Sequence, residues 1–178
     1  MASVTVTKRP HPFAPDRFER LLSIGAMILL AAVLIALARG HAHWSEIGAV
    51  VWAHLATILV ALALTPSMLL RPRGDRLHRR LGWLWCAAML LTAALSFLVH
   101  TSRPGGYSVI HILSAWVLIQ VPLLVWRART HNVKAHRRAV RAMVLGALLI
   151  AGFFTFPFNR MLGSWLFGTS RHSASANI

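Results

Sequence analysis

The sequence predicts an all-α, polytopic membrane protein with five transmembrane helices. Of its 178 residues, 57% are hydrophobic, and the mean hydropathy of +0.61 is unlike that of an ordinary soluble domain. Five apolar runs each approach the ~20 residues that a helix needs to cross a bilayer. They are Leu21–Ala38, Ile47–Leu70, Leu81–Val99, Val109–Trp126 and Ala139–Phe158. These runs use most of the chain, so we expect a single transmembrane domain over residues 21–168.

The basic residues are spread unevenly over the segments between these runs. Of the 19 Lys and Arg, 15 fall in the N-terminal segment and in the second and fourth connections. The other 4 fall in the first and third connections and in the C-terminal segment. The positive-inside rule therefore predicts a multi-pass protein of the plasma (inner) membrane, with its N-terminus in the cytoplasm and its C-terminus outside. The net charge of +15 then suits the lipid bilayer and its anionic phospholipid head groups. No nucleic-acid partner is expected.

The first run differs from the other four because it carries no polar side chain beyond Ser23. We therefore expect the first helix at the periphery and helices 2–5 in an antiparallel four-helix core. The first run is longer than a signal-peptide core and is directly followed by Arg39, which favours an uncleaved helix. Residues 1–20 are predicted to be a cytoplasmic basic tail, and residues 169–178 a disordered extracytoplasmic tail.

Histidines are the candidate functional residues, since the chain has ten of them against four acids. By the predicted topology, three lie toward the outside and three toward the cytoplasm at the ends of spans: His54, His100 and His111, and His78, His131 and His136. On the third helix one face carries His78, Trp85, Thr92, Ser96 and His100. A polar stripe against lipid is costly, so this face is predicted to point into the bundle.

Paired imidazoles from facing helices are a pattern typical of haem b ligation. His54 and His111 form a candidate outer pair, and His78 and His136 a candidate inner pair. Near the inner pair lie a small residue and cations that suit a porphyrin and its propionates: Gly82, Arg79, Arg137 and Arg138. One alternative is a metal site of His54, His100 and His111. Another is that the histidines only cap carbonyls and contact lipid phosphates, which is the interpretation favoured for His131.

Several motifs within residues 45–165 resemble those of one protein family and follow in the same order. They are His54, then His78-Arg79-Arg80-Leu81-Gly82-Trp83, Ile110-His111-Ile112-Leu113-Ser114, His131 with His136-Arg137-Arg138, and Ala151-Gly152-Phe153-Phe154-Thr155-Phe156-Pro157 with Arg160. The chain is thereby similar to bacterial predicted membrane proteins called domain of unknown function 2306, although Val140 stands where that family often has Met. The resemblance implies a multi-span membrane protein and brings no established activity.

A second likeness concerns arrangement alone. One histidine on each of four successive helices, alternating between the two faces, resembles the di-haem transmembrane cytochromes b that pass electrons from ascorbate. It implies a haem b protein that moves electrons across the membrane. Two other functions stay open: a non-catalytic partner or assembly protein with structural histidines, and a small metal-handling transporter. The scarcity of acids argues against a cation-coupled carrier, and no nucleophile–base set indicates a hydrolase. The sequence names neither a redox partner nor a protein partner.

Overall fold

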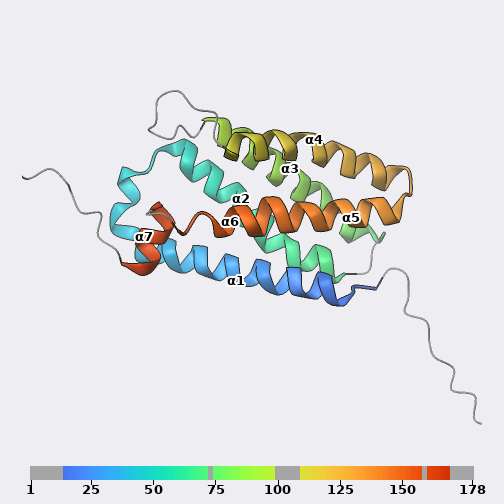
Figure 1. Ribbon diagram of the computed structural model, residues 1–178, viewed down its shortest axis with the longest axis horizontal. Helices are drawn as coiled ribbons and strands as arrows, with labels where there is room; N and C mark the ends of the chain where they lie inside the picture. The colour runs from blue at the N-terminus through green and yellow to red at the C-terminus, as the bar shows by residue number, and fades with distance from the viewer. Residues whose placement is uncertain (1–13, 72–73, 99–108, 158–159, 169–178) are drawn as a thin grey trace, which may run out of the picture.

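The computed structural model describes residues 14–71, 74–98, 109–157 and 160–168, and every regular element in these ranges is helical. The elements lie side by side along the long axis of the molecule (Figure 1). In chain order they are α1 (Arg17–Arg39), η1 (His41–Glu46), α2 (Ala49–Leu70), α3 (Arg76–Leu98), α4 (Val109–Arg129), α5 (Val133–Met143), η2 (Val144–Ile150), α6 (Ala151–Phe153) and α7 (Met161–Phe167). The predicted all-α class is confirmed.

Four helices are long and apolar enough to cross a membrane, namely α1, α2, α3 and residues 111–129 of α4. This finding is consistent with the predicted membrane protein. The fifth apolar run is instead divided among α5, the π-helix η2 and α6. Helix α5 begins six residues before the apolar run because Asn132 caps it, accepting a hydrogen bond from the backbone N–H of Ala135 at 3.1 Å.

Helix α1 likewise begins earlier than the apolar pattern indicates. The carboxylate of Asp16 accepts from the backbone N–H of Glu19 at 3.0 Å, and the Glu19 carboxylate accepts from the backbone N–H of Asp16 at 3.2 Å. This reciprocal capping box satisfies two N–H groups that would otherwise be orphaned at the helix start. Residues 16–20, which were assigned to the basic tail, therefore belong to the folded unit.

The packing partners of α1 include α2, η2 and α7. Its buried face runs along its whole length and includes Ala26 and Ala36, whose small side chains let neighbouring helices approach closely. At its end, a side chain in place of the hydrogen at Gly40 would collide with the indole of Trp165 from α7. Sequence analysis put the first helix at the periphery, but in the structure α1 is a packed member of the bundle.

The remaining principal contacts join α2 to α3, α3 to α4 and α4 to α5. The polar face predicted for α3 is buried in these contacts, since Trp85, Thr92 and Ser96 are all buried. Trp85 donates its indole N–H to the hydroxyl of Thr65 at 3.0 Å, so the side-chain polar groups are paired between helices. The hydroxyls of Ser96 on α3 and Ser114 on α4 also form a hydrogen bond with each other. The predicted direction of this face is confirmed up to Ser96, whereas His100 lies outside the described residues.

Candidate functional site

A cavity of about 700 Å³ opens at the end of the bundle where α3 begins, α4 ends and α5 begins. We call this the basic end, because Arg79, Arg129 and Arg137 line the cavity there. The deeper wall is apolar and is built by α2, α3, α4, α5 and the first residue of η2. Cavities of roughly 300–1,000 Å³ with apolar walls and a few convergent polar groups are typical of cofactor and small-molecule sites.

Both histidines of the predicted inner pair line this cavity. His78 comes from the first turn of α3, and His136 from the first turn of α5. Gly82, one turn beyond His78, also lines it, and a Cβ added there would already touch Cε of Met68 at 3.4 Å. The exposed His131 lies at the edge of the same cavity. The structure thus places on one cavity two imidazoles from α3 and α5, which have the whole of α4 between them in the sequence.

The turn between α4 and α5 fixes the position of His136. His131 adopts a left-handed backbone conformation (φ 57°), which reverses the chain before Asn132 caps α5. The imidazole of His136 then donates from Nδ1 to the carbonyl of Leu124 at 3.1 Å. Because a carbonyl can only accept, this bond places the proton on Nδ1 and makes Nε2 the basic nitrogen. Iron and zinc ligands of proteins are oriented by the same kind of backbone bond.

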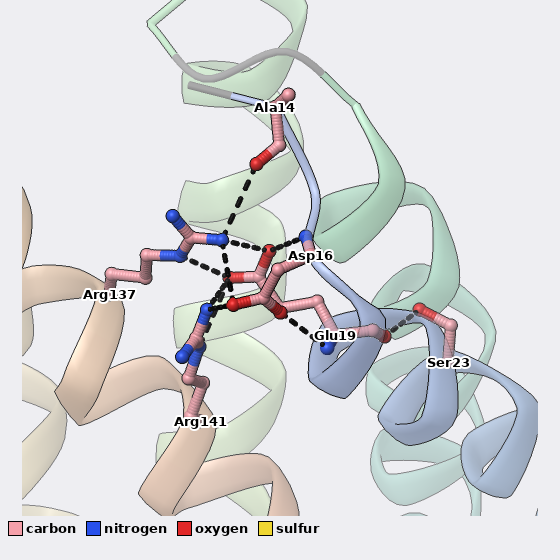
Figure 2. Close-up of polar contacts among 6 residues, drawn as sticks. All are labelled: Ala14, Asp16, Glu19, Ser23, Arg137 and Arg141. Carbon is pink, nitrogen blue, oxygen red and sulfur yellow. Dashed lines mark hydrogen bonds and ion pairs between the residues drawn. The ribbon is translucent and has the colours of Figure 1, made fainter. Parts of the chain in front are cut away.

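Beside His136, two arginines of α5 hold two carboxylates of α1 (Figure 2). Arg137 donates from Nε and a terminal nitrogen to the two oxygens of Glu19, at 2.8 and 2.9 Å. Arg141 donates from Nε to Glu19 at 3.2 Å and also bonds Asp16. The Glu19 side chain is only 1% exposed, whereas that of Asp16 is 44% exposed, so this nearly neutral ion cluster extends from a buried carboxylate to the surface. We call these four residues the Glu19 cluster.

The electrostatics of the Glu19 cluster favour its charged form. Burial raises the pKa of Asp16, but the hydrogen bond from the Glu19 backbone N–H and the pairing with Arg141 outweigh it, so the net pKa lies below the ordinary value. The hydrogen bond to Glu19 raises the pKa of Arg137 further above its usual range, against the opposing effect of burial. Glu19 and Arg137 also line the cavity, so this charged pair forms part of its wall.

The Glu19 cluster was not predicted, because the polar composition of residues 1–20 places both acids in a tail. One local signal was present: the spacing of Asp16 and Glu19 is that of a capping box ahead of an apolar run. The pairing with Arg137 has no local signal, since the two residues are 118 positions apart. Arg138, also expected near the cavity, is not among the residues that line it.

At the opposite end of the bundle, the histidines of the predicted outer pair have packed surroundings. His54 donates from Nδ1 to the carbonyl of Thr92 on α3 at 3.1 Å. His111 lies against the ring of Phe97, with 5.5 Å between ring centroids. Neither histidine lines a cavity described here. The outer haem pair and the alternative metal site, which needs His100 as well, stay predictions; among the described residues no group of three His, Cys, Asp or Glu is arranged to hold a metal ion.

The residues around the cavity fit haem b in their chemistry. Haem needs an apolar slot for its macrocycle, imidazole nitrogen for its iron and cations for its propionates. Leucine and valine side chains of α2, α4, α5 and η2 supply the slot, and His78 and His136 supply imidazoles. Arg79 and Arg129 add positive charge at the same end, although Arg79 also donates to the carbonyl of Gly74.

The likenesses drawn from the sequence, to domain of unknown function 2306 and to the di-haem cytochromes b, stay predictions. We found no protein-family model, no curated protein and no solved structure that matches this chain. What the site does therefore has to be inferred from its own geometry and charge.

Proposed function

We propose that the protein is a five-span membrane protein that binds haem b at its basic end and passes electrons. The membrane part is supported by four apolar helices of sufficient length and by the continuous helical path from α5 through η2 to α6, which supplies a fifth segment. The ribbon also reverses its direction between successive long helices (Figure 1). The basic end then faces the cytoplasm, because it carries most of the arginines.

This topology has a direct test. A reporter inserted at Gly74, in the exposed turn before α3, should report the cytoplasm, and a reporter fused after Ile178 should report the outside. Gly74 has a left-handed backbone and open space around it, so an insertion there disturbs little packing. A cytoplasmic signal from the Ile178 fusion would contradict the odd number of spans.

The haem part depends on one observation: His78 and His136 line a single cavity of about 700 Å³. In this proposal the Nε2 atom of His136 is the ligand, held in register by the bond from Nδ1 to Leu124. His78 would supply the second imidazole, and Arg79 would pair with the propionates. Haem b held in this way supplies a one-electron couple whose potential depends on its axial ligands and surroundings.

The test is the visible absorption spectrum of purified protein, oxidised and reduced, after expression with ample haem. Wild-type protein should show a low-spin b-type spectrum. His136→Ala and His78→Ala should each remove the haem at the basic end. The matched control is His131→Asn, which changes a histidine at the edge of the same cavity and keeps a residue type that tolerates φ > 0. The control should keep the full spectrum.

The outer pair extends this proposal to a second haem. His54→Ala or His111→Ala should then remove only the outer spectral component and leave the component at the basic end. If the outer variants leave the haem-to-protein ratio unchanged, the protein holds one haem. Colourless wild-type protein would overturn haem binding as a whole.

A second candidate function is a non-catalytic membrane partner or assembly protein with structural histidines. One observation favours it: His54 and His136 each donate Nδ1 to a backbone carbonyl of a neighbouring helix. Such bonds fasten helices together without any cofactor. If this is the function, purified wild-type protein is colourless, and His136→Ala lowers its thermal stability.

A further inference from the structure

A groove of about 440 Å³ lies between α3 and α4, next to the cavity. Its wall is apolar over most of its length, with Ala87 and Leu90 from α3 and Val121 and Pro122 from α4. Pro122 has no backbone N–H, so the helix loses one internal bond beside the groove. At the basic end the groove finishes at Trp83 and Arg129.

The groove opens on the outer surface of the bundle. The side chain of Trp83 is 57% exposed, and Ala87 and Trp126 are exposed as well. From Arg129 back to Val121 the helix rises about 12 Å, close to the ~15 Å of hydrocarbon in one leaflet of a bilayer. An acyl chain that follows the groove from its basic end therefore reaches about the middle of the membrane.

Among the residues that the structure describes, Arg129 has no acidic counterion. All four acidic residues are paired elsewhere: Asp16 and Glu19 with Arg137 and Arg141, Glu46 with His43, and Asp75 with Arg71. The contact described for the Arg129 guanidinium is with the face of Trp83, at 5.8 Å from the ring centroid. A cation held over an indole at a membrane boundary is positioned to receive an anion from outside the protein.

We propose that this groove binds one anionic phospholipid, with its phosphate at Arg129 and one acyl chain along Ala87, Leu90 and Val121. The apolar length matches one leaflet, and the unpaired charge lies at the end where head groups begin. The site rests on the membrane insertion and orientation proposed above, and it does not depend on haem.

Binding is measured by native mass spectrometry of the full-length protein in detergent, titrated with dioleoyl phosphatidylglycerol or dioleoyl phosphatidylcholine. Arg129→Gln should weaken phosphatidylglycerol binding about fivefold, the usual contribution of one arginine near a charged membrane surface. The matched control is Arg127→Gln, which removes the same charge from the same turn but on nearly the opposite face of the helix. It should bind like wild type, and phosphatidylcholine should bind weakly to all three proteins.

A second pair of variants tests the acyl groove. Ala87→Trp fills the groove from an exposed position without disturbing the buried core, and it should reduce phosphatidylglycerol binding. Leu84→Trp adds an indole to an exposed position of α3 outside the groove and should not. Equal binding by Arg129→Gln and Arg127→Gln, or by Ala87→Trp and Leu84→Trp, would overturn the site.

The membrane proposal is checked separately by alkaline carbonate treatment of cell membranes. Release of the protein by carbonate would overturn both the membrane proposal and the lipid site. Retention in the membrane with lipid binding that none of the variants changes would overturn the lipid site alone. Colourless protein that still binds phosphatidylglycerol in the predicted pattern supports the lipid site and overturns only haem binding.

Discussion

The two ends of the bundle use the same residue type in different surroundings. At the basic end, His78 and His136 line a cavity beside cations. At the opposite end, His54 bonds the backbone of α3, and His111 packs against Phe97. A histidine at the end of a long apolar helix is therefore not a site by itself. What distinguishes the basic end is the space in front of the imidazoles and the charge around that space.

The ion pairs of the protein differ in burial. The Glu19 carboxylate is buried and joins α1 to α5, whereas the pair of Arg71 and Asp75 at the same end and the pair of His43 and Glu46 in the short helix η1 are exposed. Buried carboxylates need close partners because desolvation is costly, whereas exposed ones are stabilised by water. The basic end is thus the place where charge contributes to the fold as well as to the cavity.

The largest expected effect comes from Glu19→Ala. This change removes the buried carboxylate that Arg137 and Arg141 share and leaves them only the more exposed Asp16; breaking a buried pair costs about 3 kcal/mol. For a protein of this length, that corresponds to a Tm lower by roughly 6–12 °C. The measurement is thermal unfolding of the purified protein followed by circular dichroism.

The control for this change is Glu46→Ala, which removes a carboxylate from the exposed pair at the opposite end. It should leave Tm unchanged within error, since exposed pairs contribute little. If Glu19→Ala melts like Glu46→Ala, the Glu19 cluster does not hold α1 to α5, and the contrast between buried and exposed pairs fails.

A smaller effect is expected from Thr65→Val, which keeps the side-chain shape and removes a hydroxyl. Trp85 then loses the acceptor of its buried indole N–H, at a cost of about 1–2 kcal/mol. Tm should fall by roughly 4 °C, whereas Thr130→Val, at an exposed hydroxyl that bonds only backbone carbonyls, should not shift it. No difference between the two variants would mean that water or a rearranged partner satisfies Trp85.

The sequence allowed much of the fold to be predicted because apolar length and helical phase are local properties. The apolar runs became helices, and the stripe of Trp85, Thr92 and Ser96 is buried as its phase requires. The two histidines of the predicted inner pair each lie in the first turn of their helix, α3 and α5, and both line one cavity. That they act as a pair of ligands stays a prediction.

Other features depend on contacts that no local pattern contains. The Glu19 cluster joins residues far apart in the chain, and nothing near Glu19 indicates which arginine will reach it. The π-helical turns of η2 arise in an apolar stretch of leucine, valine, alanine, isoleucine and one glycine, in which no residue indicates a π-helix in place of an α-helix. Helix α7 is short, and its place against α1 depends on Gly40, whose importance appears only once Trp165 lies over it.

The Glu19 cluster also has a consequence for biosynthesis. Glu19 leaves the ribosome 118 residues before Arg137, and at about 5–20 residues per second this leaves a gap of roughly 6–24 s. In the proposed membrane topology, α1 can enter the bilayer during that interval on its own apolarity, but its carboxylate has to stay hydrated at the membrane surface. Insertion of the first helix and its final docking are therefore separate events, and the newly made chain completes its bundle only when α5 emerges.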